Sequence, residues 1–192
     1  DNTDKLGFRC VTTPTLRFKD VVLTDEHVIG DVGQAELILL STLDFIRFGG
    51  ASVILGIVVG GLRHIVPWLE QRRVTGGVPL INKSDVQITL GRIHAEVQVV
   101  RMLMWRAADL LDQGKPCSVE TAVAKFKGSE LAVEATGHFV QMLGWRGIDK
   151  DYPAHKRLRD ARVTTIYEGT SQIQLLNLFR ELRRSIHTGG NL

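Results

Sequence analysis

The sequence predicts an all-α protein, an antiparallel helical bundle with a short N-terminal β segment. Two observations predict this fold. From about residue 34 onward, apolar residues recur at steps of three and four, which is the period of a helix with one buried face. The helical stretches are also joined by short connections, which favour antiparallel neighbours. A chain of 192 residues is long enough to build one domain with a hydrophobic core.

Residues 1–30 differ from the rest of the chain. The stretch LRFKDVVL mixes β-branched and aromatic residues with polar ones, and it lies between the turn-forming segments TTPT and DVG. This pattern predicts short strands at about 6–10 and 15–24. Because two short strands cannot form an independent sheet, they either cover part of the helical domain, residues 31–192, or are the end of a larger β-domain.

The first helix is expected at about residues 34–73. It is rich in small residues, and a glycine inside a helix costs roughly 1 kcal/mol relative to alanine. We therefore expect another helix or a ligand to approach this helix closely. Pro67 should kink the helix or end one segment of it. The small residues are Gly49, Gly50, Ala51, Gly56, Gly60 and Gly61.

The second helix is expected from Ser84, which with Gln87 forms a candidate capping pair, to Asp112. A third helix should follow to about residue 143, with Ser118 and Thr121 as candidate caps. We expect a loop over 144–153 and two shorter helices at about 154–165 and 170–187. Thr170 is the candidate N-cap of the last helix.

Composition argues against several classes of function. The net charge is only +3 and there is no basic block with interleaved aromatic residues, which disfavours nucleic-acid binding. The histidines show no metal-ligand spacing, and the two cysteines, Cys10 and Cys117, form no CxxC motif. The most apolar run, residues 51–62, is too short to span a bilayer. We expect no metal site, no membrane span, no signal peptide and a reducing compartment.

The most informative motif is RDARVTTIYEGTSQIQ, residues 159–174. Glu168 lies between Tyr167 and Gly169, directly before a helix with an apolar face. A carboxylate with apolar neighbours has a raised pKa and is a stronger base than one in water. The alternative is that Glu168 only interacts favourably with the N-terminal dipole of that helix.

These residues resemble the base-bearing segment of the acyl-CoA dehydrogenase family. Four further segments are similar to the family in the same order: LDFIR (43–47), LEQRRVTGG (69–77), VQMLGWRG (140–147) and DYPAHKRLRDAR (151–162). Residues 5–31 also resemble the last strands of the family's middle β-domain. The resemblance therefore covers the C-terminal half of a usual member, with 1–30 as the remnant of the β-domain and 31–192 as the helical domain.

The resemblance implies that Glu168 removes the α-proton of an acyl-CoA thioester while a β-hydride passes to N5 of FAD, giving 2,3-enoyl-CoA. A backbone N–H of the base residue would hold the thioester oxygen. Asp44, Arg47 and Gly169 would line the substrate site, although a charged pair three residues apart on a helix is often only structural. In a subset of the family the base lies at the position of Ile46, which has no ionisable group, and this favours Glu168.

The resemblance also assigns FAD contacts. Arg72 would bind the pyrophosphate of FAD in a neighbouring subunit, and Gln141 and Gly144 belong to a flavin loop. Thr170 and Gln172, which follow Glu168 in the sequence, would also contact FAD. For Thr170 the alternative is simple helix capping. The chain departs from the family pattern at Trp145, where relatives have a second glycine, and at Thr75, where they have phenylalanine.

The family further implies a homo- or heterotetramer, electron-transferring flavoprotein as the electron acceptor, and a location in the bacterial cytoplasm or the mitochondrial matrix. A second reading of the sequence is an interaction module. In that reading the chain is a truncated or divergent relative that assembles with a fuller partner and is not catalytic alone.

Overall fold

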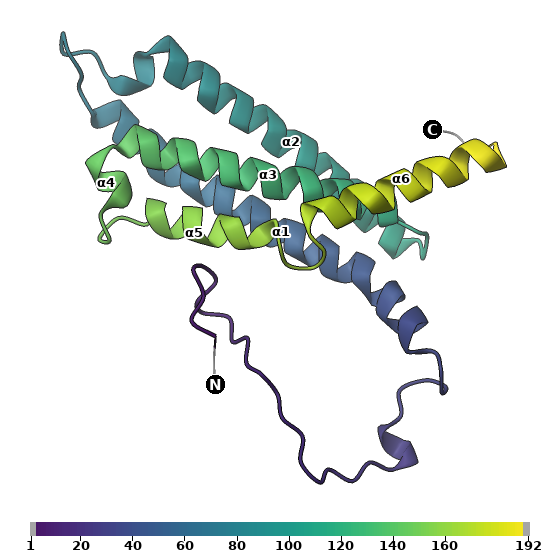
Figure 1. Cartoon of the computed structure of the whole chain (residues 1–192). Coiled ribbons are helices and arrows are strands. Elements are labelled where there is room, and N and C mark those ends of the chain that lie inside the picture. Colours follow the sequence, from purple (N-terminus) through teal and green to yellow (C-terminus); the bar gives the residue numbers. More distant parts are fainter. Residues whose placement is uncertain (1–2, 190–192) are drawn as a thin grey trace.

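The computed structural model describes residues 3–189, and the expected all-α bundle is confirmed (Figure 1). Three long helices form its body: α1 (Ala35–Gln71), α2 (Ser84–Asp112) and α3 (Ser118–Leu143). The short helices are α4 (Trp145–Ile148), α5 (Ala154–Thr164) and α6 (Ser171–Thr188), with 3-10 turns η1 (Asp25–His27) and η2 (Leu80–Asn82).

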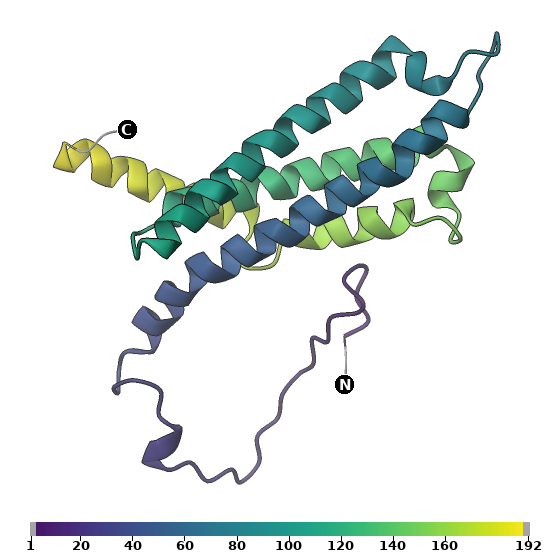
Figure 2. The same cartoon turned by 180° about the vertical axis from the view of Figure 1, so that it is seen from behind.

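Helix α3 is the centre of the bundle. It packs against α1, α2, α4, α5 and α6, and both views show it between α2 and α5 (Figures 1 and 2). The core is built from one face of each long helix and is closed by the fully buried ring of Phe139. Helix α6 leaves the bundle at an angle, so most of its apolar residues are partly exposed.

The glycines of α1 are used for close packing, as the sequence predicts. A Cβ on Gly61 would stand 2.3 Å from Cε2 of Phe139, and a Cβ on Gly60 would stand 2.7 Å from the Arg157 guanidinium. A Cβ on Gly56, in contrast, would meet no atom within 4 Å. Helix α1 continues through Pro67 to Gln71, so the proline does not end it.

Helix α1 has the length and apolar composition of a membrane span. However, Ile54, Val58 and Ile65 on this helix are fully buried in the bundle. The exposed part of its apolar surface lies mainly near its N-terminal end, at residues such as Leu37 and Phe45. The buried residues show that α1 is used as a core helix of the bundle.

The strands expected at about 6–10 and 15–24 are not formed. Residues 3–33 are an irregular segment that begins beside the bundle and then loops away from it before joining α1, with η1 as its one 3-10 helix (Figure 1). A strand needs a neighbouring strand to satisfy its backbone groups, and none lies beside this segment among residues 3–189. Its apolar side chains are accordingly uncovered: Phe18 is 78% exposed and Val22 is 84% exposed.

The expected caps are wrong for two of the three helices. Ser84 is the first residue of α2 and caps nothing, and α3 follows Cys117 with no side-chain cap. The Ser118 hydroxyl donates to Asp44 on α1, and the Thr121 hydroxyl lies 3.1 Å from the Cys117 carbonyl and 3.3 Å from Asp44. Thr170 is confirmed as the N-cap of α6, where its Oγ1 accepts a hydrogen bond from the N–H of Ile173. The expected loop 144–153 contains the short helix α4, since Gly144 and Gly147 close a turn directly after α3.

Candidate active site

Glu168 lies in the loop between α5 and α6, in a strained backbone conformation. Its φ is 55° and that of Gly169 is 91°, so two consecutive residues adopt the left-handed region. That region costs a non-glycine residue roughly 1–3 kcal/mol. Flanking hydrogen bonds hold the loop: Ser129 Oγ donates to the Thr164 carbonyl (2.9 Å), and the Ser171 N–H donates to the Thr165 carbonyl (3.1 Å).

The Glu168 carboxylate lies against helix α1 at Gly50. A Cβ on Gly50 would stand 2.1 Å from Oε2 of Glu168, so only glycine leaves room for this carboxylate. The Tyr167 hydroxyl lies beside it and donates to the Gly50 carbonyl at 3.4 Å. The small residues of the first helix thus create space for a functional group as well as for packing.

The electrostatic surroundings of Glu168 suit a general base. Its Oε2 is buried and has no hydrogen-bond partner among the described residues. Burial raises the pKa of Glu168, while the positive charges of Lys125 and Arg47 act in the opposite direction. Burial and the neighbouring Glu168 also raise the pKa of Tyr167, so its phenol stays protonated. The carboxylate is therefore more basic than one in water.

The carboxylate opens onto an apolar cavity of about 460 Å³. Helix α1 supplies one wall with Ile46, the two glycines 49 and 50, and Val53. The Glu168 side of the cavity is formed by Val163 and Tyr167, and residues of the N-terminal segment close the remaining side. An apolar cavity with one unpaired carboxylate can receive a hydrocarbon chain and place its carbon atoms near a base.

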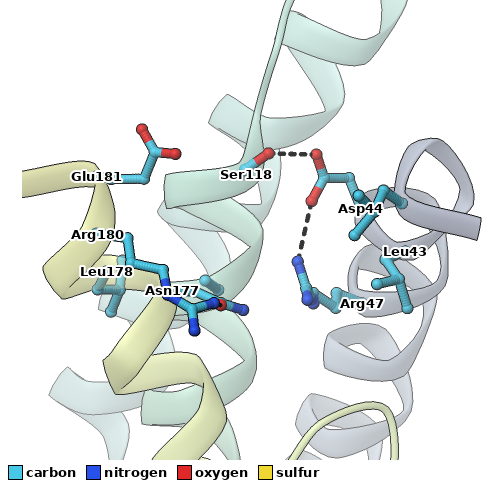
Figure 3. A pocket seen from close by; sticks show the side chains of 10 residues that line it. Leu43, Asp44, Arg47, Ser118, Asn177, Leu178, Arg180 and Glu181 are labelled. Carbon is cyan, nitrogen blue, oxygen red and sulfur yellow. Dashed lines mark hydrogen bonds and ion pairs between the residues drawn. The ribbon is translucent and has the colours of Figure 1, made fainter. Parts of the chain in front are cut away.

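Asp44 and Arg47 lie at a second, smaller cavity of about 220 Å³ between α1, α3 and α6 (Figure 3). The Asp44 carboxylate accepts hydrogen bonds from Ser118 Oγ (2.5 Å) and Arg47 (3.2 Å). Figure 3 also shows Asn177 and Arg180 on the α6 side of this cavity. The positive charge of Arg47 also acts to lower the pKa of Glu168, so this arginine lies between the polar cavity and that carboxylate.

Arg72, Gln141 and Gly144 come together at the opposite end of the bundle. They line a third cavity of about 390 Å³, with Trp145 beside them. The Arg72 side chain is exposed and makes no hydrogen bond or ion pair within residues 3–189. Gly144 has a φ of 60°, and a Cβ there would meet nothing within 4 Å. An unpaired guanidinium beside an open glycine backbone fits a phosphate group.

The residues expected to contact FAD therefore fall into two groups. Thr170 lies next to the base, with Gln172 exposed on the first turn of α6. Gln141 lies 16 residues beyond Lys125 on α3, and Lys125 contacts the loop of Glu168. That separation corresponds to about 24 Å along a helix. One flavin ring cannot touch both groups of a single chain.

Sequence reasoning missed two buried polar residues that hold the loop of Glu168 (residues 165–170, called the base loop below). They are Lys125 on α3 and Gln174 on α6. Both are fully buried. The signal for Lys125 was a lysine on the apolar face of the third helix, in line with residues 121, 128 and 132. Among residues 3–189 no group of three or more histidine, cysteine or acidic residues could hold a metal ion.

Comparison with known proteins identifies the family. Residues 37–182 match the family described as "Acyl-CoA dehydrogenase, C-terminal domain". The chain belongs to the acyl-CoA dehydrogenase family. Members of this family are FAD-dependent flavoproteins and act as oxidoreductases in fatty acid β-oxidation.

Individual relatives agree with this assignment. The chain is 40% identical over 182 residues to the mitochondrial short-chain specific acyl-CoA dehydrogenase of Rattus norvegicus. This match covers 95% of this chain and 44% of that protein. It resembles the structure of butyryl-CoA dehydrogenase from Megasphaera elsdenii with a TM-score of 0.91 and 34% identity, over 95% of this chain and 47% of that one. A chain in a structure described as the electron transferring flavoprotein of Acidaminococcus fermentans also matches, with a TM-score of 0.91 and 34% identity. That match covers 95% of this chain and 48% of the other. The chain thus spans about half the length of the acyl-CoA dehydrogenases it matches.

Proposed function

We propose that this chain is the base-bearing half of an acyl-CoA dehydrogenase, with Glu168 as the base that removes the α-proton of an acyl-CoA thioester. The observation that carries the proposal is Glu168 itself: its Oε2 is buried and unpaired among the described residues, and its side chain lines an apolar cavity, in a family of known chemistry. Removal of a proton next to a thioester needs a desolvated base placed close to that carbon.

The backbone of the same loop can stabilise the charge that develops on the thioester oxygen. Within residues 3–189, the N–H of Glu168 donates no hydrogen bond, so it remains available to the substrate carbonyl. A preformed N–H at this position stabilises an enolate-like transition state. Gly169 allows the substrate to approach, because no side chain projects from the residue after the base.

The two cavities divide the substrate between them. We assign the acyl chain to the apolar cavity and the polar part of the coenzyme A thioester to the cavity of Asp44 and Arg47. The side chains of Ile46 and Val53 line the apolar cavity next to Glu168 and limit the space for an acyl chain. Together with the short-chain specificity of the rat relative, this favours a short acyl group.

The residues present fit FAD. Thr170 and Gln172 would hold the FAD that serves the base of the same chain. Arg72, Gln141 and Gly144 would hold the pyrophosphate of a second FAD that serves a neighbouring subunit, because about 24 Å separates the two groups along α3. When bound, FAD supplies the acceptor for the hydride that leaves the β-carbon. This division of contacts favours a homo- or heterotetramer in which subunits share their cofactor sites.

The partner that accepts electrons is proposed to be an electron-transferring flavoprotein, in agreement with the Acidaminococcus fermentans neighbour. The location is proposed to be the bacterial cytoplasm or the mitochondrial matrix, since relatives come from mitochondria and from Megasphaera elsdenii. Residues 1–30 are proposed to be the end of the middle β-domain, which accounts for their uncovered apolar side chains.

The deciding experiment uses the complete protein that contains this chain. We expect it to reduce an electron-accepting dye with butyryl-CoA, and Glu168→Gln to lower kcat by about 10²- to 10⁴-fold while FAD remains bound. Glu96→Gln, the same change on the exposed side of α2, is the matched control. An inactive wild-type protein that assembles with a second, active subunit would support the interaction module instead.

A further inference from the structure

Lys125 is a fully buried lysine whose side chain ends at the base loop. It projects from α3, and its Nζ donates a hydrogen bond of 2.7 Å to the carbonyl of Gly169. The same nitrogen lies 5.6 Å from the centre of the Tyr167 ring. The ammonium group therefore contacts the residues on both sides of Glu168.

Gln174 holds the loop from the other direction. It is fully buried on α6, and its Nε2 donates to the carbonyls of Glu168 (3.1 Å) and Gly169 (3.3 Å). A Cβ on Gly169 would stand 2.7 Å from that nitrogen. The two buried side chains thus turn both carbonyls of the Glu168–Gly169 pair toward the interior, and the strained left-handed conformation follows from this arrangement.

Three charged groups act on Lys125. Glu168 approaches from the loop and Arg47 from α1, while Glu130 lies on α3 itself and Tyr167 adds its ring. Glu130 is engaged by the Ser171 hydroxyl at 2.6 Å. Glu168 is therefore the acidic group near Lys125 that has an unpaired oxygen.

Burial of Lys125 is unfavourable for folding. Desolvation lowers the pKa of Lys125 to about 8 despite the attraction of Glu168. An ammonium group taken out of water is costly unless it is hydrogen-bonded or paired with an opposite charge. The partners that offset this cost, the Gly169 carbonyl and the charge of Glu168, both belong to the loop of Glu168.

We propose that Lys125 is a positioning residue for Glu168: its ammonium group fixes the Gly169 carbonyl and supplies a positive charge that favours the ionised carboxylate. The proposal rests on the proposed role of Glu168 as the base. By fixing the Gly169 carbonyl, Lys125 also directs the backbone N–H of Glu168 toward the substrate. It makes no contact with the reacting atoms itself.

The test uses two substitutions in the complete, FAD-loaded protein. Lys125→Met removes the charge and the hydrogen-bond donor but keeps an unbranched apolar stem. Lys125→Gln removes the charge and keeps a donor for Gly169. Lys127→Met is the control, because Lys127 is a partly exposed lysine on the same helix that pairs with Glu96 at 3.4 Å.

Two readouts separate this inference from the proposed function. Infrared titration of the protonated carboxyl band, assigned by its loss in Glu168→Gln, reports the pKa of Glu168 without turnover. The pH profile of kcat/KM reports the same ionisation during catalysis. We expect both Lys125 variants to move the Glu168 titration and the acidic limb to higher pH, with no change in Lys127→Met.

The pH-independent plateau of kcat/KM separates the loss of positioning from the loss of charge. Lys125→Met should lower the pH-independent kcat/KM by about 10- to 100-fold, and Lys125→Gln by less, because a small displacement of a catalytic group costs about this much. An unchanged Glu168 titration in both variants overturns the proposal, as does failure of both to fold, which would make Lys125 a structural residue. If the titration moves but the wild-type protein oxidises no acyl-CoA, the proposed function fails and the electrostatic role of Lys125 stands.

Discussion

Gly50 and Glu168 meet so closely that the carboxylate Oε2 would stand 2.1 Å from a Cβ placed on the glycine. The two residues are far apart in sequence, and the contact sets where the base can stand. Gly50→Ala should push the carboxylate out of position and lower kcat/KM by about 100-fold. Steady-state kinetics with butyryl-CoA measure this loss.

Gly56→Ala is the control for that substitution. Gly56 lies on the same helix, and a Cβ there meets nothing within 4 Å. Alanine should stabilise the helix by roughly 1 kcal/mol and leave the kinetics unchanged. Equal activity of the Gly50→Ala protein and the wild type would show that the carboxylate does not need this position.

The pH dependence of the reaction follows from the raised pKa of Glu168. The base must be ionised, so kcat/KM should fall as the pH decreases through the pKa of the folded protein. Because burial raises that pKa, the acidic limb should lie above the ordinary glutamate value of 4.5. A profile that stays flat below this value would exclude Glu168 as the base.

The same shift predicts the effect of Glu168→Gln on stability. A carboxyl group with a raised pKa binds its proton more tightly in the folded state, so ionisation destabilises the fold as the pH rises above 4.5. At pH 7 the Glu168→Gln protein should be at least as stable as the wild type in urea denaturation. A clear loss of stability would mean that the ionised carboxylate contributes to folding.

Lys125→Met should uncouple stability from activity. The unfolded chain binds the Lys125 proton up to about pH 10.5 and the folded chain up to about pH 8, so the stability contributed by this site increases with pH across that interval. At pH 7 the free energy of unfolding should be unchanged or higher, by at most about 3 kcal/mol. Loss of the hydrogen bond to Gly169 offsets roughly 1 kcal/mol of that gain. Thermal unfolding at pH 7 and pH 10 checks both statements.

Arg72→Ala tests the proposal that the cavity of Arg72, Gln141 and Gly144 binds the pyrophosphate of FAD. Loss of a charged hydrogen-bond donor to phosphate should weaken FAD binding by roughly 10- to 100-fold. The ratio of bound flavin to protein, measured by absorbance after dilution, reports the change. Arg73→Ala is the matched control, since Arg73 is the adjacent exposed arginine and does not line this cavity. Equal flavin loss in both variants would argue against a specific phosphate contact.

Much of the bundle could be predicted because its information is local. Helix periodicity, the end of the second helix at Asp112 and the Thr170 cap each depend on neighbouring residues, and the structure confirms them. The short strands were wrong because a strand depends on a partner that residues 3–189 do not supply. The cap assigned to Ser118 was wrong because Ser118 is already the first residue of α3, where its hydroxyl donates to Asp44, 74 residues away, and accepts no hydrogen bond from a backbone N–H of the helix.

The motif pointed to Glu168, but its surroundings required the structure. Gly50, Lys125 and Gln174 reach the base loop from three different helices, and no sequence spacing connects them. A buried lysine on an apolar helix face is visible in the sequence, yet its target is not. Burial and long-range contacts decide which polar residues act on the base.

Helix α3 carries Lys125 in its first half and Gln141, a proposed flavin contact, near its other end. An added or deleted residue between them would turn the two ends against each other by about 100°. One site would then face the wrong side of the bundle, whatever residue was added. Exposed amino acids between 125 and 141 can change, but the number of residues cannot, and an insertion scan through this segment should find no tolerated position.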